Sequence, residues 1–165
     1  LKGLFDVEFV DQTDLDTLRR ICQERQPQII LTESPSNPVL RIADLSAIRE
    51  IATGCDALFA VDNTFLSPAL QNPIEFGADL VIHSTTKYIN GHSDVVGGAV
   101  VARSPRLLEE LDWWANCVGS TASPWDCAKT MRGLRTLHAR LRCHEENALE
   151  AARALQYEIG GRGNA

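Results

Sequence analysis

Short apolar runs alternate with stretches of helical periodicity along most of this chain. Apolar runs at residues 28–31, 57–61 and 80–82 have the length of buried strands, and a further apolar run covers residues 99–101. Residues 5–10 alternate apolar and polar side chains, which predicts a half-buried strand. The pattern therefore predicts at least four short strands with long intervals between them.

Helical spacing of apolar residues fills several of these intervals. Thr13 or Asp14 can cap a first helix, and Asp44 can start a second one. Ser104 is followed by proline, a pair that caps and begins a helix. The apolar positions over residues 125–159 predict one long helix.

Strands that alternate with helices indicate right-handed strand–helix–strand units. We therefore expect an α/β fold with a mostly parallel sheet and helices on both faces. In such sheets, ligands bind at the carboxyl ends of the strands. Asn37, Asp62 and residues 84–87 each follow the end of a predicted strand, so they should converge on one edge of the sheet.

Composition narrows the class of protein. The 165 residues carry a formal net charge of −6, which argues against a nucleic-acid partner. No apolar run has the length of a membrane span. The cysteines are scattered, odd in number and never in a CxxC pair, and the histidines have no metal-ligand spacing. This favours reduced thiols in the cytoplasm and no metal site. The cysteines are Cys22, Cys55, Cys117, Cys127 and Cys143.

The side chains at the predicted sheet edge match the needs of pyridoxal 5′-phosphate. Lys87 offers an amine that can form a Schiff base with the cofactor aldehyde. Asp62 offers a carboxylate that can keep the ring nitrogen protonated. The hydroxyls of Ser84 and Thr86 suit a phosphate, and the amide of Asn37 suits the ring oxygen.

Each of these residues also has a purely structural interpretation. Asp62 alone fits an Asx turn, and Asn37 between two prolines fits a turn. Ser84 and Thr86 fit capping groups, and Lys87 alone fits a solvated loop lysine. The cofactor hypothesis therefore rests on the conjunction of the groups. Four other residues have side chains that could take part in catalysis or binding, but we expect structural roles for them. They are His83, His92, Trp113 and Trp114.

Several segments of the chain resemble the Cys/Met-metabolism family of pyridoxal-phosphate enzymes. They are ESPSNPVLRIADL (33–45), VDNTFLSPALQNP (61–73), GADLVIHSTTKYINGHSDVVGG (77–98) and MRGLRTL (131–137). The resemblance extends from about Phe5 to Tyr157. LSPALQNP and WWAN are most similar to bacterial members that make cystathionine by γ-replacement.

The resemblance implies a specific fold, site and reaction. The fold is the large domain of fold-type I, aspartate-aminotransferase-like enzymes. Lys87 matches the Schiff-base lysine and Asp62 the partner of the ring nitrogen, while Ser84 and Thr86 match phosphate ligands and Asn37 a residue near the ring hydroxyl. The implied reaction replaces the acyl group of an O-acylated homoserine by cysteine to give cystathionine, in an enzyme that forms homo-oligomers, tetramers at full length.

We also expect the chain to be a partial domain. Residues 1–159 match an incomplete cofactor-binding domain that ends in the long helix, and residues 160–165 read as a disordered tail. An N-terminal segment and a C-terminal small domain of the family are expected to be absent. Lys129 departs from the pattern, because it occupies a helix position that is usually apolar.

Three alternative functions remain open from the sequence. One is a related reaction, γ-lyase or O-acylhomoserine sulfhydrylase. The second is a catalytically silent fragment that acts only in self-association, driven by exposed apolar surface. The third is a Rossmann-type nucleotide binder, which the lack of a GxGxxG turn after the first strand disfavours.

Overall fold

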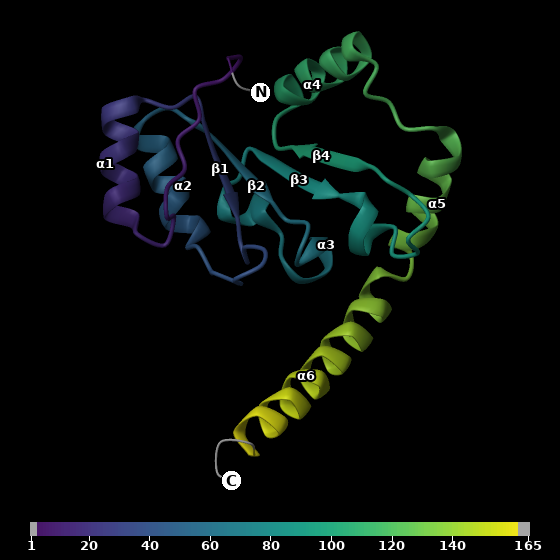
Figure 1. Cartoon of the computed structure of the whole chain (residues 1–165). Helices are drawn as coiled ribbons and strands as arrows, with labels where there is room; N and C mark the ends of the chain where they lie inside the picture. The colour runs from purple at the N-terminus through teal and green to yellow at the C-terminus, as the bar shows by residue number, and fades with distance from the viewer. Residues whose placement is uncertain (1–2, 162–165) are drawn as a thin grey trace.

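A four-stranded sheet forms the centre of residues 3–161, the part of the chain that this computed structural model describes (Figure 1). The strands follow chain order as β1 (Ile29–Glu33), β2 (Leu58–Asp62), β3 (Leu80–Ser84) and β4 (Gly98–Ala102). β1, β2 and β3 are parallel, whereas β4 is antiparallel to β3. The prediction of a mostly parallel α/β sheet is confirmed.

Two helices, α1 (Leu15–Arg25) and α2 (Leu45–Gly54), pack against each other and cover one face of the sheet (Figure 1). Asp14 and Asp44 cap them, because each carboxylate accepts a hydrogen bond from the backbone amide three residues later. Both predicted helix starts are thus confirmed. Apolar side chains between these helices and the strands form the core, including Leu18, Ile30, Ile48, Phe59, Val61 and Val81.

Residues 5–10 do not form the predicted strand. Phe5 makes a single bridge, and residues 6–10 have no regular secondary structure. The apolar side chains that alternation places on the buried face are exposed, and Phe9 is 95% exposed. The prediction was wrong because alternation produces a strand only where a neighbouring strand accepts and donates the ladder hydrogen bonds.

Short helical segments connect the strands, and a longer helix follows the last one. The short segments are α3 (Ser67–Leu70), η1 (Pro73–Phe76) and η2 (Thr85–Ile89). Helix α4 (Pro105–Val118) begins after the predicted cap Ser104, whose hydroxyl accepts a hydrogen bond from the Leu107 amide.

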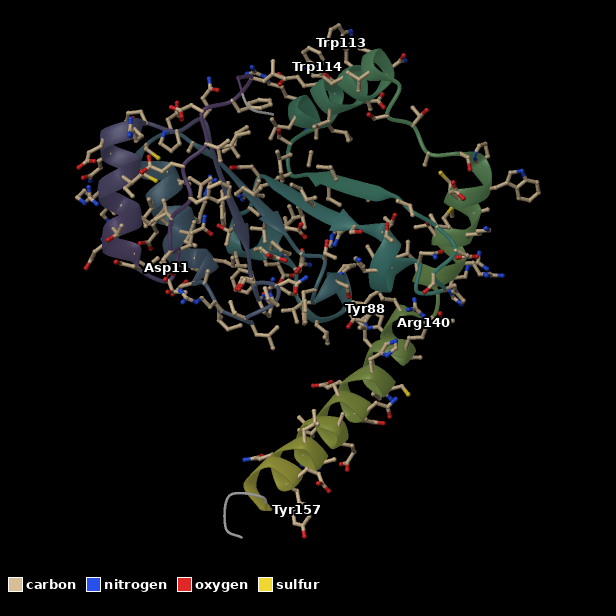
Figure 2. All side chains as sticks on the ribbon, viewed as in Figure 1. Asp11, Tyr88, Trp113, Trp114, Arg140 and Tyr157 are labelled. Atoms are coloured by element: carbon tan, nitrogen blue, oxygen red, sulfur yellow. The ribbon has the colours of Figure 1, made fainter. Side chains whose placement is uncertain are left out.

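Trp113 and Trp114 do not pack in the core, although we expected a packing role for them. They are 60% and 59% exposed on α4. Their rings contact each other edge to face, with centroids 4.8 Å apart. Figure 2 shows both side chains on the outer side of that helix. A helical stripe of large apolar residues therefore does not by itself identify a buried face.

The long helix predicted over residues 125–159 is two helices, α5 (Pro124–Leu134) and α6 (Leu137–Gly161). The chain turns between them because the Gly133 carbonyl does not accept the hydrogen bond from the amide four residues later that would continue an α-helix. It accepts hydrogen bonds from the Thr136 amide, at 3.1 Å, and from the Arg140 guanidinium, at 2.8 Å. Apolar periodicity continues across this turn, so spacing alone could not reveal it.

Helix α6 projects away from the sheet (Figure 1). Leu137 and Leu141 in its first turns are buried, whereas Leu155 is 63% exposed. The helix continues to Gly161, slightly beyond its predicted end, and the rest of the predicted tail, 162–165, lies outside the described residues. No helix within residues 3–161 combines the length and the apolar character needed to cross a membrane.

Candidate functional site

The carboxyl ends of β1, β2 and β3 meet at one edge of the sheet, because these strands are parallel neighbours. Asp62 is the last residue of β2 and pairs in register with Glu33 of β1 and Ile82 of β3. Ser84 is the last residue of β3, and Lys87 follows in the next turn. The structure therefore brings Asp62, Ser84 and Lys87 to the same sheet edge, as the parallel pattern predicts.

Thr64 joins the ends of β2 and β3. Its backbone amide donates a hydrogen bond to the Asp62 carboxylate, at 2.9 Å. Its hydroxyl accepts a hydrogen bond from the backbone amide of Ser84, at 2.7 Å. Thr64 is a site residue that the sequence did not single out, since the Asp-Asn-Thr turn gives no sign of which strand its third residue contacts.

Lys87 lies in the irregular turn η2, which has π-type hydrogen bonding. Its backbone angles, φ −89° and ψ −124°, are not helical, so the chain changes direction at this residue. The Gly91 amide donates a hydrogen bond to the Lys87 carbonyl at 2.8 Å and closes the turn. Turns of this type are frequent at functional sites. The Lys87 side chain is exposed, so this chain alone does not bury its amine.

The loop before β4 closes over η2 through Gly97. The Gly97 amide donates to the Thr86 hydroxyl at 2.9 Å, and the same hydroxyl donates to the Gly97 carbonyl at 3.3 Å. A side chain at position 97 would meet the Thr85 hydroxyl at 2.9 Å, so this close approach requires glycine. The longer of the two Thr86 contacts is the weaker, and its proton can turn to an anion instead.

The remaining two predicted ligands differ in their surroundings. The Ser84 side chain is half-buried, and its hydroxyl makes no hydrogen bond within residues 3–161. Asn37 is exposed in the loop after β1, where its backbone amide donates a hydrogen bond to the Glu33 carboxylate at 3.3 Å. Asn37 thus lies after the strand next to β2, and its side chain faces solvent in this chain.

His83 lies on the opposite face of β3 from Ser84 and is buried. Burial lowers the pKa of its imidazole, opposed by the backbone of Asn63 and the charge of Asp62. We expected a structural histidine with satisfied hydrogen bonds. Instead its Nδ1 is buried without a hydrogen-bond partner among the described residues. Neutral imidazole is therefore the favoured form, which is compatible with a packing role beside Asp62.

The loop after Lys87, residues 90–94, contacts α5 through an ion pair. The Asn90 side chain donates a hydrogen bond to the Asp94 carboxylate at 2.8 Å, and this lowers the pKa of Asp94. Lys129 on α5 forms an ion pair with the same carboxylate at 3.5 Å. His92 Nδ1 lies 2.6 Å from the Asn90 carbonyl oxygen. The polar residue at position 129, unusual for its helix position, therefore has a partner in the loop that follows Lys87.

The geometry of this sheet edge agrees with a family comparison. The family model described as Cys/Met metabolism PLP-dependent enzyme matches residues 2–159. The chain belongs to this family. The resemblance of the sequence segments is thereby confirmed, and so is the class of enzyme to which the chain is related.

Two kinds of Cys/Met-metabolism enzyme are similar to the chain. The cystathionine gamma-synthase of Escherichia coli is 50% identical over 155 residues, which are 94% of this chain and 40% of that protein. The cystathionine gamma-lyase of Dictyostelium discoideum is 41% identical over 92% of this chain and 40% of that protein. Members of both reaction types are thus related to it.

A solved structure gives the same result for the fold. The cystathionine gamma synthase of Xanthomonas oryzae pv. oryzae, in complex with aminoacrylate and cysteine, superimposes with a TM-score of 0.90 at 57% identity. The match covers 94% of this chain and 40% of that one. The chain therefore spans about two-fifths of the length of the relatives that it matches.

The residues at the sheet edge fit pyridoxal phosphate, the cofactor of the Cys/Met-metabolism family. Asp62 uses one carboxylate oxygen for Thr64, which leaves the other available to a protonated ring nitrogen. The unpaired hydroxyl of Ser84 and the movable proton of Thr86 are donors for a phosphate. The exposed amine of Lys87 has no ion pair within residues 3–161 and is accessible to an aldehyde.

Proposed function

We propose that this chain is the cofactor-binding part of a pyridoxal-phosphate enzyme of transsulfuration, similar to cystathionine γ-synthase. The reaction would replace the acyl group of an O-acylated homoserine by the sulfur of cysteine and give cystathionine. One observation carries the proposal: Asp62 ends β2, Lys87 follows the end of β3, and Thr64 joins these neighbouring strand ends. The domain limits, residues 1–159, are part of the same proposal.

Each residue has a role that its chemistry supports. Bound pyridoxal phosphate supplies an electron sink for carbanion chemistry on an amino acid. Lys87 would hold the cofactor aldehyde through its amine, and the same amine, once freed by the amino group of a substrate, would move protons between the substrate carbons. Asp62 keeps the ring nitrogen protonated, Ser84 and Thr86 bind the phosphate, and Asn37 bonds the ring oxygen.

The sequence identities to a γ-synthase and to a γ-lyase help to choose between γ-replacement and γ-elimination as the proposed reaction. The bacterial γ-synthase from E. coli is 50% identical to the chain, whereas the γ-lyase from D. discoideum is 41% identical. This difference favours γ-replacement. The γ-lyase and O-acylhomoserine sulfhydrylase reactions are the alternatives, and a product analysis with an O-acylated homoserine, with and without cysteine, separates the three.

We further propose that the chain forms homo-oligomers in the cytoplasm, with small amino acids as its substrates. Its exposed apolar side chains support association, and some of them are direct neighbours, such as Trp113 and Trp114 of α4, whose ring centroids are 4.8 Å apart. Examples from different elements are Phe9, Val96, Trp125 and Tyr157, at 95%, 89%, 80% and 79% exposed. The free thiols of the five cysteines support a reducing compartment. Self-association without catalysis is the alternative function for the isolated chain.

Absorbance spectroscopy with added pyridoxal phosphate tests the proposed site. We expect the visible band of lysine-bound cofactor with the unmodified chain and with K129R, which removes another lysine amine but keeps a cation beside Asp94. We expect K87A to lose the band, and D62N to weaken it because the ring nitrogen loses its partner. A K87A chain that keeps the band at full intensity would contradict the proposal.

Turnover separates cofactor binding from catalysis. The isolated chain should form cystathionine from O-acetyl- or O-succinyl-homoserine and cysteine only at a negligible rate. The reason is that it spans about two-fifths of its relatives' length, so most substrate-positioning groups are expected elsewhere. Turnover by the isolated chain at the rate of a full-length relative would contradict the assignment of the chain as a partial domain.

A further inference from the structure

Arg140 in the second turn of α6 binds the backbone that follows Lys87. Its guanidinium donates hydrogen bonds to the carbonyl oxygens of Tyr88, at 2.8 Å, and Ile89, at 3.4 Å. The same group donates to the Gly133 carbonyl at 2.8 Å. Figure 2 shows Arg140 next to Tyr88 where α6 begins. One side chain thus connects the lysine turn η2 with the junction of α5 and α6.

The chemistry of this contact requires arginine. Three carbonyl oxygens in different directions match the planar fork of a guanidinium, whereas a lysine ammonium is a point charge on a flexible stem. The Thr136 hydroxyl accepts a further hydrogen bond from Nε, at 3.0 Å, and fixes the plane of the group. Hydrogen bonds from a charged donor are stronger than neutral ones. The half-buried Arg140 is therefore a rigid clamp on the η2 backbone.

Two glycines make room for the clamp. A Cβ at Gly91 would lie 2.0 Å from the Arg140 guanidinium, and Gly91 has a φ of +71°. A Cβ at Gly133 would lie 2.3 Å from the Asn90 carbonyl oxygen. Glycine at both positions therefore allows the lysine turn, the start of α6 and the end of α5 to approach each other closely.

We propose that Arg140 is a positioning residue for Lys87. By holding the two carbonyls that follow Lys87, it fixes the non-helical turn from which the lysine side chain projects, and so the place of the amine relative to Asp62. This inference rests on the proposed function, in which that amine holds the cofactor aldehyde. Arg140 itself has no contact with the cofactor in this assignment.

Hydrogen exchange measured without cofactor tests the clamp directly. The Asn90 and Gly91 amides close η2 through hydrogen bonds of 3.0 Å and 2.8 Å. We expect R140M to speed exchange of these two amides by about tenfold or more, because a charged hydrogen-bond donor is lost. Exchange in β2 should change less. The matched control is R142M, which removes an exposed arginine from the same helix.

Titration with pyridoxal phosphate tests the consequence for Lys87. R140M should raise the apparent dissociation constant for the lysine-bound band by about tenfold, from the loss of a charge-assisted bond. R142M should leave it unchanged. R140K keeps the charge without the fork, so it should resemble R140M in exchange and titration even where it restores the melting temperature. If R140M does not fold, R140K gives the same comparison.

The outcomes separate this inference from the proposed function. Equal exchange of the Asn90 and Gly91 amides in the R140 and R142 variants would overturn the clamp. Faster exchange of these amides in R140M, with an unchanged apparent dissociation constant for pyridoxal phosphate, would leave Arg140 with a structural role only. That result would overturn its positioning role. A K87A chain that keeps the band overturns the proposed function itself, whatever the R140 variants show. A normal K87A result with unaffected R140 variants overturns only the role of Arg140.

Discussion

The hydroxyl of Thr64 accepts a hydrogen bond from the backbone amide of Ser84 at 2.7 Å. This contact matters because β2 and β3 pair only from Ala60 to Asp62 on the β2 side, so the ladder ends at Asp62, itself a site residue. Thr64 extends the connection past the last ladder pair and orients the Asp62 carboxylate through its own amide. The relative position of the acid and the lysine turn therefore depends on this threonine.

Replacing Thr64 by valine should loosen the site. Valine has the same shape but leaves the Ser84 amide without its acceptor, which costs about 1–3 kcal/mol for a shielded backbone donor. Threonine to serine keeps the hydroxyl and should cost less. Urea unfolding of T64V and T64S measures the difference, and equal unfolding free energies for the two variants would show that the hydrogen bond contributes nothing.

An alanine at position 133 should destabilise the junction of α5 and α6. Its methyl group would lie 2.3 Å from the Asn90 oxygen and 2.5 Å from the Ile89 oxygen, so the helix must move away from the lysine turn. Overpacking of this kind costs about 1–3 kcal/mol.

A Cβ added at Gly54 would meet no described atom within 4 Å beyond its own helix backbone, so G54A is the control. It should stabilise the chain by about 0.5–1 kcal/mol. Thermal unfolding should show a lower melting temperature for G133A and a higher one for G54A. An unchanged melting temperature in G133A would contradict the close approach of Gly133 to the lysine turn.

The ion pair between Arg49 and Asp79 should contribute to stability, unlike the exposed pairs. Its atoms are 2.7 Å apart, the two side chains are 31% and 17% exposed, and Asp79 also accepts the Phe59 amide at 2.9 Å. R49M leaves a mostly buried carboxylate short of a donor, at a cost of about 1–3 kcal/mol. R106M breaks the exposed pair with Glu110 and should cost about 0–1 kcal/mol. Chemical denaturation measures the loss of unfolding free energy in R49M and R106M. Equal losses would show that burial of the Arg49–Asp79 pair has no effect.

Stability should fall at alkaline pH because of Cys22. Burial raises the pKa of this thiol to about 11 from an ordinary value of 9.0, with a smaller contribution from the neighbouring Cys55. The unfolded chain ionises at lower pH than the folded one, so the stability present below pH 9 is lost as the pH rises towards 11. The full loss is about 2–3 kcal/mol. C22A should remove this slope between pH 9 and 11, whereas C143A, at an exposed thiol, should keep it. An unchanged slope in C22A would exclude Cys22 as its source.

The parallel core was predictable because its signals are local. Buried strands such as 57–61 are continuous apolar runs, and Asp14 and Asp44 are strong helix caps. Residues 5–10 and 125–159 were predicted wrongly for a different reason. The first needs a neighbouring strand that the described chain does not provide, and the second is broken by a carbonyl shared between Thr136 and Arg140. Both outcomes depend on tertiary contacts.

The sheet edge of the site was predictable from topology, whereas its supporting contacts were not. Asp62 and Lys87 follow strand ends, so the order of parallel strands brings them together. Thr64 accepts a hydrogen bond from the Ser84 backbone amide, the Gly97 backbone amide donates to the Thr86 hydroxyl, and Arg140 donates to the Tyr88 carbonyl. One partner in each contact is a backbone group, which leaves no signature in a sequence, so a single sequence gives no reason to choose these three residues.

Identification of the lysine that holds the cofactor tests the central claim most directly. The chain has lysines at positions 2, 87 and 129, so reduction with borohydride in the presence of pyridoxal phosphate can mark each one separately. Peptide mass spectrometry of the reduced chain should find the phosphopyridoxyl group on Lys87 at substoichiometric cofactor. Preferential labelling of Lys129 or Lys2, with Lys87 unmodified, would contradict the account.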